Sequence, residues 1–233
     1  DFEVKTAANG EQGMEQALNS IPDIIVSDIM MPVMNGITMC KILKEDVRTS
    51  HIPIILLTAK DSLQDKEEGY QVGADSYLTK PFSATLLHSR INNLLESRKR
   101  LTERFNTSTP HHNMDEKRAL LAESLNKLDN EFIEKINQLI EARLSSEKID
   151  IGYLADNMCM SKSTLYRKMK ALTGLSTNEY VRKIKMQHAE RLLLEGRYNI
   201  SEVAFRVGIN SVVYFRQCFK EEFGVLPSEY LKQ

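Results

Sequence analysis

The feature that most constrains the fold is an alternation of short apolar runs and helical segments through the first hundred residues. Continuous apolar runs at Asp23–Ser27, Ile52–Ala59 and Asp75–Lys80 are typical of buried strands, and Phe2–Ala7 alternates like a further strand. Because strands covered on both faces are apolar throughout, this pattern predicts an α/β doubly wound, flavodoxin-like parallel sheet. Helical spacing predicts helices in the intervals, at Asn9–Ser20, Gly36–Asp46, Ser62–Gly73 and Phe82–Leu101.

Each of these helices is expected to bury one apolar face against the sheet. The inward positions follow the three-to-four-residue spacing of a helix. We expect them to include Met14, Ala17, Leu18, Ile37, Cys40, Ile42, Leu43, Leu86, Leu87, Ile91, Leu94 and Leu95.

The second half changes to helical periodicity throughout, which predicts an all-α domain. A polar stretch rich in Ser, Thr and Pro, Asn106–Asn113, is interpreted as a linker. The segment YLADNMCMSKSTLYRKMKALTG then resembles EVAFRVGINSVVYFRQCFKEEFG, with Arg167 aligned on Arg216. Each copy reads as a short helix, a tight turn and a second helix. An amphipathic helix, Leu175–Leu194, is predicted to join the two copies.

Composition excludes some classes of protein. The chain has 233 residues and a net charge of −1, so whole-chain charge predicts neither nucleic acid nor membrane binding. The halves differ, at roughly +4 from Ser146 onward and roughly −5 before it, which suggests a basic face near one end. Cys40, Cys159 and Cys218 have no metal-binding spacing, and we expect them to be buried in a reducing cytosol.

Three polar residues stand where successive strands end: Asp28, Thr58 and Lys80. The carboxyl ends of parallel strands meet at one crevice, so these side chains are expected to converge. A carboxylate can act as the nucleophile that forms an acyl phosphate, while an ammonium and a hydroxyl hold the phosphoryl oxygens. The sequence therefore predicts phosphoryl transfer at this edge, with a metal completing the site.

Residues 1 to about 98 resemble a two-component receiver domain through SDIMMPVMNG, LLTAK and GADSYLTKPF. The resemblance implies Asp28 as the phosphoacceptor and as a magnesium (Mg2+) ligand together with the backbone carbonyl of Met30. It implies Thr58 and Lys80 as phosphoryl contacts, with a cis peptide bond before Pro81. It also implies Tyr77 as an aromatic switch residue.

The chain departs from the family pattern at its beginning. The family starts with a central strand followed by paired acids that bind magnesium, and both are absent here, as is the first helix. The chain is therefore interpreted as part of a longer protein. We expect Mg2+ binding only in the intact receiver, and inefficient phosphorylation of the 233-residue chain by itself.

The acid has other interpretations. A phosphatase of the haloacid dehalogenase type needs a second acid two residues after the nucleophile, where this chain has Met30. A lone aspartate can also simply cap a turn. A further alternative is a DNA-binding regulator whose receiver acts only as an interaction or dimerisation module, without phosphorylation.

The repeated helix-turn-helix pattern, with basic second helices, predicts DNA binding. A serine or asparagine begins each second helix as a capping residue. Leu165, Met169 and Leu172 are expected to point inward, as are Phe215, Phe219 and Phe223. The candidate DNA-binding residues are Ser161, Lys162, Ser163, Tyr166, Arg167 and Lys170 in the first copy and Asn210, Ser211, Arg216, Gln217 and Lys220 in the second.

Asp129–Gln233 resembles an AraC/XylS-type DNA-binding domain, chiefly through ISEVAFRVGINSVVYFRQCFKEEFGVLPSEY. The resemblance implies two recognition helices in successive major grooves, about 34 Å apart. Arg167 and Arg216 would contact guanines, and three lysines would contact phosphates. The three lysines are Lys162, Lys168 and Lys220.

Two positions depart from the AraC-type pattern. Cys159 stands where the first turn usually has glycine, whereas the second turn keeps Gly208. Val212 and Val213 begin the second recognition helix, where exposed methyl groups could touch thymine methyls.

The sequence thus predicts a phosphorelay-controlled transcription regulator in three parts: a partial receiver (1–98), a helical extension and linker (99–128) and a DNA-binding domain (129–233). The expected partners are promoter DNA, a histidine kinase module in cis or in trans, a second copy of the chain after phosphorylation, and RNA polymerase. We expect a cytoplasmic location and no enzymatic activity in this chain. The parent protein is either a free-standing regulator or a hybrid sensor with a kinase and a membrane anchor.

Overall fold

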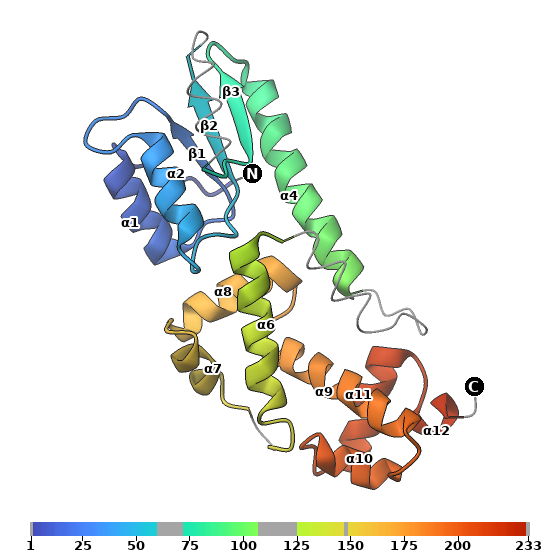
Figure 1. Cartoon of the computed structure of the whole chain (residues 1–233). Helices are drawn as coiled ribbons and strands as arrows, with labels where there is room; N and C mark the ends of the chain where they lie inside the picture. Colours follow the sequence, from blue (N-terminus) through green and yellow to red (C-terminus); the bar gives the residue numbers. More distant parts are fainter. Residues whose placement is uncertain (1, 60–71, 107–124, 147–148, 232–233) are drawn as a thin grey trace. The chain divides into compact units, whose positions relative to one another are not determined.

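The computed structural model describes residues 2–59, 72–106, 125–146 and 149–231. It contains two compact units, built mainly from Asp1–Leu101 and from Asn130–Gln233 (Figure 1). The helix predicted at Ser62–Gly73 and the linker beyond Asn106 lie almost entirely outside the described residues.

The first unit contains a three-stranded parallel sheet, as the apolar runs predict. The strands β1 (Ile25–Asp28), β2 (Ile54–Thr58) and β3 (Ser76–Thr79) lie in the order β1-β2-β3 (Figure 1). In this register Asp28 pairs with Leu57, and Thr58 pairs with Thr79. The three strands therefore end together at one edge of the sheet.

Helices lie on both sides of this sheet, which confirms the α/β class. The helices α1 (Gly10–Ser20) and α2 (Gly36–Glu45) pack together beside β1, and α4 (Ala84–Asn106) runs on the other side beside β3 (Figure 1). The core between α1, α2 and the strands is built from apolar side chains. It contains Ala17, Ile29, Ile37, Met39, Cys40, Leu43, Ile54, Leu56 and Ala74.

Three predictions for this unit are wrong. Residues 2–7 form no strand and are exposed, because a strand needs a hydrogen-bonded neighbour and no described strand pairs with them. Ile42 is 37% exposed and Leu86 is 45% exposed, although both fit the inward spacing. Each lies at the border of its helix's apolar face, so it meets solvent on one side.

The second half is helical throughout its described residues, as predicted. Its helices are α6 (Lys127–Glu141), α7 (Ile151–Asn157), α8 (Lys162–Thr173), α9 (Thr177–Leu194), α10 (Ile200–Arg206), α11 (Val212–Phe223) and α12 (Pro227–Tyr230). Helices α7 with α8, and α10 with α11, form the two helix-turn-helix motifs, and α9 connects them (Figure 1).

The connecting helix α9 is not amphipathic, contrary to the sequence prediction. Five consecutive residues, Lys183–Gln187, are all buried, so every side of the helix is covered there. Helices α8, α10 and α11 all contact α9, and Figure 1 shows it in the interior of this unit. The second unit is therefore organised around one enclosed helix.

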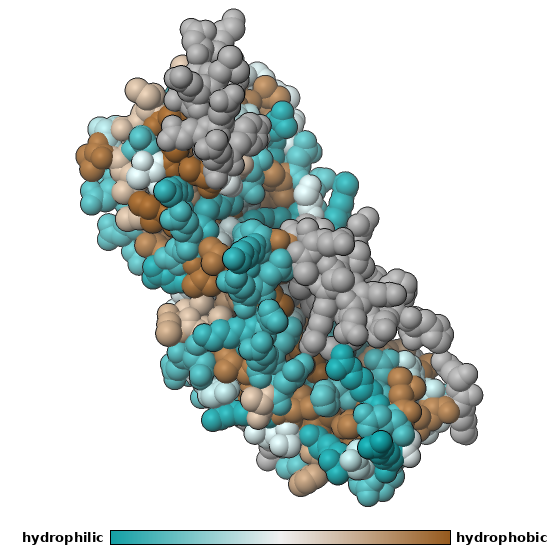
Figure 2. Space-filling model, in the orientation of Figure 1, coloured by the Kyte–Doolittle hydropathy of each residue, from teal (hydrophilic) through white to brown (hydrophobic). Residues whose placement is uncertain are grey.

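The visible surface of both units mixes hydrophilic and hydrophobic residues (Figure 2). Among the described residues, the exposed large hydrophobic side chains include Met30, Val33, Phe205, Val213 and Tyr214. No helix in the described part of the chain combines the length and the apolar character needed to cross a membrane.

Candidate functional site

The acid that ends β1 is brought close to the start of α2 by the Asn-Gly pair that follows it. Asn35 caps α2 by accepting a hydrogen bond from the Thr38 N–H at 2.7 Å. The Gly36 N–H donates to the Ile29 carbonyl at 2.9 Å. A Cβ atom at Gly36 would lie 2.1 Å from the carbonyl oxygen of Asp28, so only glycine permits this approach.

Asp28 and Lys80 are brought together as the sequence predicts. The Lys80 ammonium donates to Asp28 Oδ2 in an ion pair, and both side chains remain partly open to solvent. The Met30 N–H donates to Asp28 Oδ1 at 3.3 Å, so the carboxylate also closes a short turn. The peptide bond between Lys80 and Pro81 is cis, as the resemblance implied.

Thr58 ends the central strand between these two residues. Its side chain is buried, and its hydroxyl donates to the Ala59 carbonyl at 3.3 Å. On the neighbouring strand, Tyr77 pairs with Leu56 and is half-buried, with its side chain packed against the apolar core beside α2. The strand ends therefore carry a carboxylate, a hydroxyl and an ammonium at one edge, and Tyr77 lies two residues before the end of β3.

The magnesium that the receiver resemblance implies needs several oxygen ligands at one place. The described residues offer the Asp28 carboxylate and the Met30 carbonyl, but no group of three or more metal-ligating side chains exists among them. The described residues are therefore not sufficient to hold the ion.

Serine side chains begin both recognition helices. Ser161 Oγ accepts from the Thr164 N–H at 3.1 Å, and Ser211 Oγ accepts from the Tyr214 N–H at 3.3 Å. The helices then end at Gly174 and Gly224, both with positive φ. The caps and ends of α8 therefore correspond to those of α11 at a constant interval in the sequence.

These matching caps correct the alignment of the repeat. The second turn contains one more residue than the first, Asn210, because Ser211 and not Asn210 is the cap. The one-residue difference in length between the two copies therefore falls in the turn, before the recognition helix. Arg167 corresponds to Gln217, and Tyr166 corresponds to Arg216, so the two helices present different side chains at equivalent positions.

The predicted DNA-binding side chains are exposed on both recognition helices. Lys168 is the exception, because it is fully buried and its Nζ lies 4.8 Å from the centre of the Phe132 ring. Leu165, Met169 and Leu172 point inward as predicted, and Lys168 lies on the same buried face of α8. The prediction that Lys168 contacts phosphate is therefore wrong.

The two turns share a left-handed backbone position but have different residues there, glycine in the second turn and cysteine in the first. Gly208 has φ 65°, and Cys159 adopts a similar left-handed conformation with φ 53° although it is not glycine. Cys159 is exposed, which contradicts the prediction that all three cysteines are buried. Cys40 and Cys218 are buried, and burial raises the pKa of the Cys40 thiol to about 11.

Sequence reasoning missed several side chains near the recognition helices. Tyr214 is exposed in the first turn of α11, beside Val213, which is 77% exposed. Lys183 and Lys185 on α9 are buried and make polar contacts with other parts of the unit. The sequence does not indicate the burial of these two lysines, because lysine side chains are usually exposed.

Comparison with known families assigns both halves. Residues 1–92 match the response regulator receiver domain, and residues 154–233 match a helix-turn-helix domain. The chain is therefore a response-regulator receiver followed by an AraC-type helix-turn-helix domain. This combination is typical of regulators that are not enzymes.

Among similar proteins is histidine kinase P4 of Formosa agariphila, which is 35% identical over 99% of this chain and 16% of its own length. The response regulator PleD of Caulobacter vibrioides is 43% identical over 40% of this chain and 20% of its own length. The alkaline phosphatase synthesis transcriptional regulatory protein PhoP of Bacillus subtilis is 42% identical over 40% of this chain and 38% of its own length. The chain thus spans only a small part of these relatives.

Solved structures similar to the chain include the C-terminal domain of AraT, a response regulator from Geobacillus stearothermophilus. It is 31% identical, with a TM-score of 0.40, and the match covers 43% of this chain and 84% of that one. The Francisella response regulator 1452 receiver domain is 39% identical, with a TM-score of 0.37, over 40% of this chain and 75% of that one.

Proposed function

We propose that the protein is a transcription regulator in which a phosphoryl group on Asp28 controls DNA binding by α8 and α11. The observation that carries the proposal is the ion pair between Asp28 and Lys80 at the carboxyl edge of the sheet. This pair supports the proposal because it leaves a carboxylate that is partly open to solvent beside a cation, next to a strand that ends in Thr58.

In the proposed reaction, a carboxylate oxygen of Asp28 attacks the phosphorus of a phosphohistidine. The new O–P bond forms as the P–N bond breaks, and the histidine departs with the bond's electron pair. The Lys80 ammonium, which pairs with the carboxylate in the resting site, then faces the phosphoryl oxygens and offsets their charge. The hydroxyl of Thr58 can reach the new group only by moving from its buried position, and Tyr77 would then change its packing.

The phosphoryl donor is a histidine kinase module, in cis or in trans. The similarity to histidine kinase P4 over nearly the whole chain favours a parent protein that is a hybrid sensor. We assign residues 1–98, 99–128 and 129–233 to the receiver, the extension and the DNA-binding domain. Efficient phosphorylation is expected to require the magnesium ligands of the intact receiver.

Phosphorylation is proposed to favour a homodimer, which raises affinity for promoter DNA by increasing the effective concentration of the second binding domain. DNA-bound dimers would then recruit RNA polymerase. This function places the chain in the cytoplasm, within a membrane-anchored parent if that parent is a hybrid sensor.

The phosphorylation step is tested by Asp28→Asn in the full-length protein, with transcription from a target promoter as the readout. Asp23→Asn is a matched control, since it removes the same charge from an exposed aspartate before the same strand. We expect Asp28→Asn to abolish signal-dependent transcription and Asp23→Asn to leave it intact. Normal induction in Asp28→Asn would instead favour the alternative, a receiver that acts only as an interaction module.

DNA reading is proposed to use the exposed side chains of α8 and α11. Arg216→Ala should weaken binding to a specific operator by about 1–3 kcal/mol while changing nonspecific binding less. Lys220→Ala is the comparison, because a phosphate contact should weaken both to the same extent. Equal losses for Arg216→Ala would reduce Arg216 to a phosphate contact.

Val213 of the second recognition helix is proposed to make an apolar contact with a base. It is exposed in the first turn of α11, and the major groove offers one apolar group, the thymine methyl. Replacing thymine by uracil in the half-site of α11 should weaken binding, and Val213→Ser should remove this sensitivity. Wild-type binding that is indifferent to the methyl groups would exclude the contact.

A further inference from the structure

A buried lysine on α9 joins the loop between α6 and α7 to the turn of the second helix-turn-helix motif. Lys185 is 5% exposed, and its Nζ donates to the Ser146 carbonyl at 2.7 Å and to the Gly208 carbonyl at 3.3 Å. Ser146 belongs to the loop that follows α6, while Gly208 belongs to the turn before α11. One ammonium group therefore joins the first half of the DNA-binding unit to the second.

The backbone at this junction is unusually close. A Cβ atom at Gly208 would lie 2.2 Å from the Ser146 carbonyl oxygen and 2.9 Å from that of Leu144. The Ser146 and Gly208 carbonyl oxygens both carry partial negative charge, and both lie within hydrogen-bond distance of Lys185 Nζ. A positive charge placed among them stabilises the arrangement, which explains why a lysine is buried at this position.

Other polar contacts join α9 to α6 and to α11. The Tyr180 hydroxyl donates to Asn137 Oδ1 on α6 at 2.9 Å, and both residues are buried. On the opposite side, Lys183 pairs with Glu222 of α11 at 3.2 Å, with side chains that are 5% and 17% exposed.

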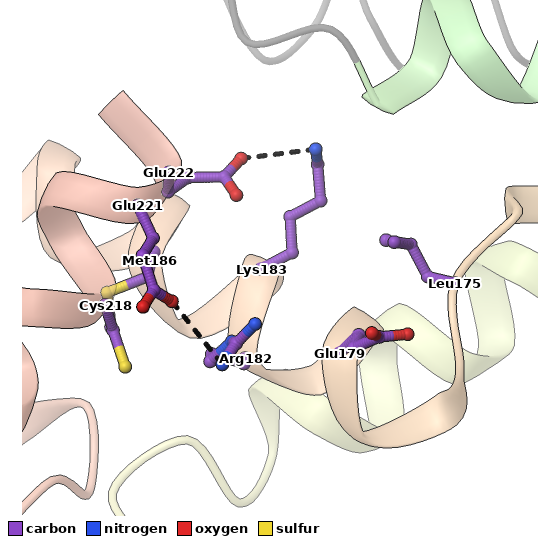
Figure 3. A pocket seen from close by; sticks show the side chains of 8 residues that line it. All are labelled: Leu175, Glu179, Arg182, Lys183, Met186, Cys218, Glu221 and Glu222. Atoms are coloured by element: carbon purple, nitrogen blue, oxygen red, sulfur yellow. Dashed lines mark ion pairs between the residues drawn. The ribbon is translucent and has the colours of Figure 1, made fainter. Parts of the chain in front are cut away.

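Figure 3 shows this second region. Lys183 extends from α9 toward Glu222, and Arg182 extends toward Glu221 at 3.7 Å. The cavity of about 200 Å³ that these side chains line lies between α9 and α11. Charged pairs therefore join α9 to α11 across a partly open space, in addition to the apolar cluster that Met186 of α9 forms with Phe215 and Cys218 of α11.

We propose that Lys185 is a positioning residue that holds the two recognition helices at one fixed separation and orientation. Apolar contacts are non-directional and permit small sliding movements, whereas hydrogen bonds from one ammonium to two carbonyls define positions. The protein would therefore read two half-sites at a single spacing and would not adapt to others. This consequence for DNA rests on the proposed function, but the geometric claim does not.

The geometric claim can be tested without DNA by measuring the distance between two spin labels. The native, exposed Cys159 provides one label in the first turn, and Lys220→Cys provides the second on α11, while the other cysteines are buried. Wild-type background should give one narrow distance distribution. Lys185→Met, which keeps the length of the side chain but removes the donors, should broaden it at least about twofold.

Lys135→Met is the matched control, because it removes an exposed lysine from α6, and it should leave the distribution narrow. An equally narrow distribution in Lys185→Met would overturn the proposal. If that variant loses its helical circular dichroism, Lys185→Gln replaces it, since this shorter neutral donor cannot hold both carbonyls. Loss of helical structure in both variants would make Lys185 a determinant of folding and would also overturn the positioning role.

The DNA consequence is tested with operators selected from a random library by the full wild-type chain. Inserting one base pair between the half-sites rotates them by about a tenth of a turn. This insertion should reduce wild-type affinity at least about tenfold, and the Lys185→Met affinity less than about threefold. Equal sensitivity in both proteins contradicts the proposal, whereas failure to select any operator contradicts the proposed function and leaves the spin-label result decisive.

Discussion

The two glycines that flank the second recognition helix provide a matched test of the junction around Lys185. Gly208 and Gly224 both have left-handed backbones, with φ of 65° and 80°. They differ in surroundings, because a Cβ atom at Gly224 meets nothing within 4 Å, whereas at Gly208 it would lie 2.2 Å from the Ser146 carbonyl oxygen. Comparing alanine at the two positions therefore separates the energetic cost of backbone strain from the cost of a steric clash.

The expected magnitudes follow from these contacts. Gly224→Ala should cost about 1 kcal/mol, since only the left-handed conformation is penalised. Gly208→Ala carries the same penalty and must also displace the loop at Ser146, which adds about 1–3 kcal/mol as in other overpacked sites. The total for Gly208→Ala is therefore roughly 2–4 kcal/mol.

Urea unfolding monitored by hydrogen exchange of amides in α9, α10 and α11 measures this difference in the relevant unit. Gly208→Ala should reduce the free energy of unfolding by at least about 1 kcal/mol more than Gly224→Ala. It should also accelerate exchange near Ser146, on the other side of the junction. Equal destabilisation by the two substitutions would refute the argument that the second turn is held against the loop after α6.

Further predictions concern side chains whose surroundings differ from their sequence pattern. Cys159 should react with a thiol reagent in the native protein, while Cys40 should remain slow even at pH 9, because burial raises its pKa to about 11 and keeps it protonated. The logarithm of the association constant for DNA should fall linearly with the logarithm of the salt concentration. Lys168→Met should leave the magnitude of this slope unchanged, whereas Lys170→Met should reduce it by about 0.9. Hydrogen bonds from the side chain and backbone of the residue that caps α9 lower the pKa of Glu179. The ionised Glu179 carboxylate should stabilise the protein at neutral pH, and this stabilisation should be lost as the pH falls through the lowered pKa. When the free energy of unfolding is measured against pH in the acid range, Glu179→Gln should lack this pH-dependent contribution.

Local chemistry explains what the sequence could predict. The caps and turns of the helix-turn-helix motifs depend on residues near one another in the chain, such as Ser161, Cys159 and Gly208. The pairing of Asp28 with Lys80 was also predictable, because parallel strands that follow one another bring their carboxyl ends to the same edge.

The errors concern features that depend on distant partners. The alternating run at residues 2–7 could form a strand only by pairing with another strand, and none of the three described strands pairs with it. Lys168 and Lys185 look like ordinary surface lysines until Phe132 and Ser146, far away in the sequence, are placed against them. Aligning the repeat on Arg167 and Arg216 gives the wrong register, because the extra residue in the second turn shifts the recognition helix by one position.

The central claim is that a phosphoryl group on Asp28 controls binding to DNA, and the affinity of the full-length protein for a selected operator tests it most directly. Fluorescence anisotropy before and after phosphorylation, with the modified fraction measured by mass spectrometry, gives this affinity. The account predicts that phosphorylation tightens binding at least about tenfold, through dimerisation, and that Asp28→Asn binds weakly under both conditions. Unchanged affinity in a protein that is fully phosphorylated on Asp28 would contradict the account.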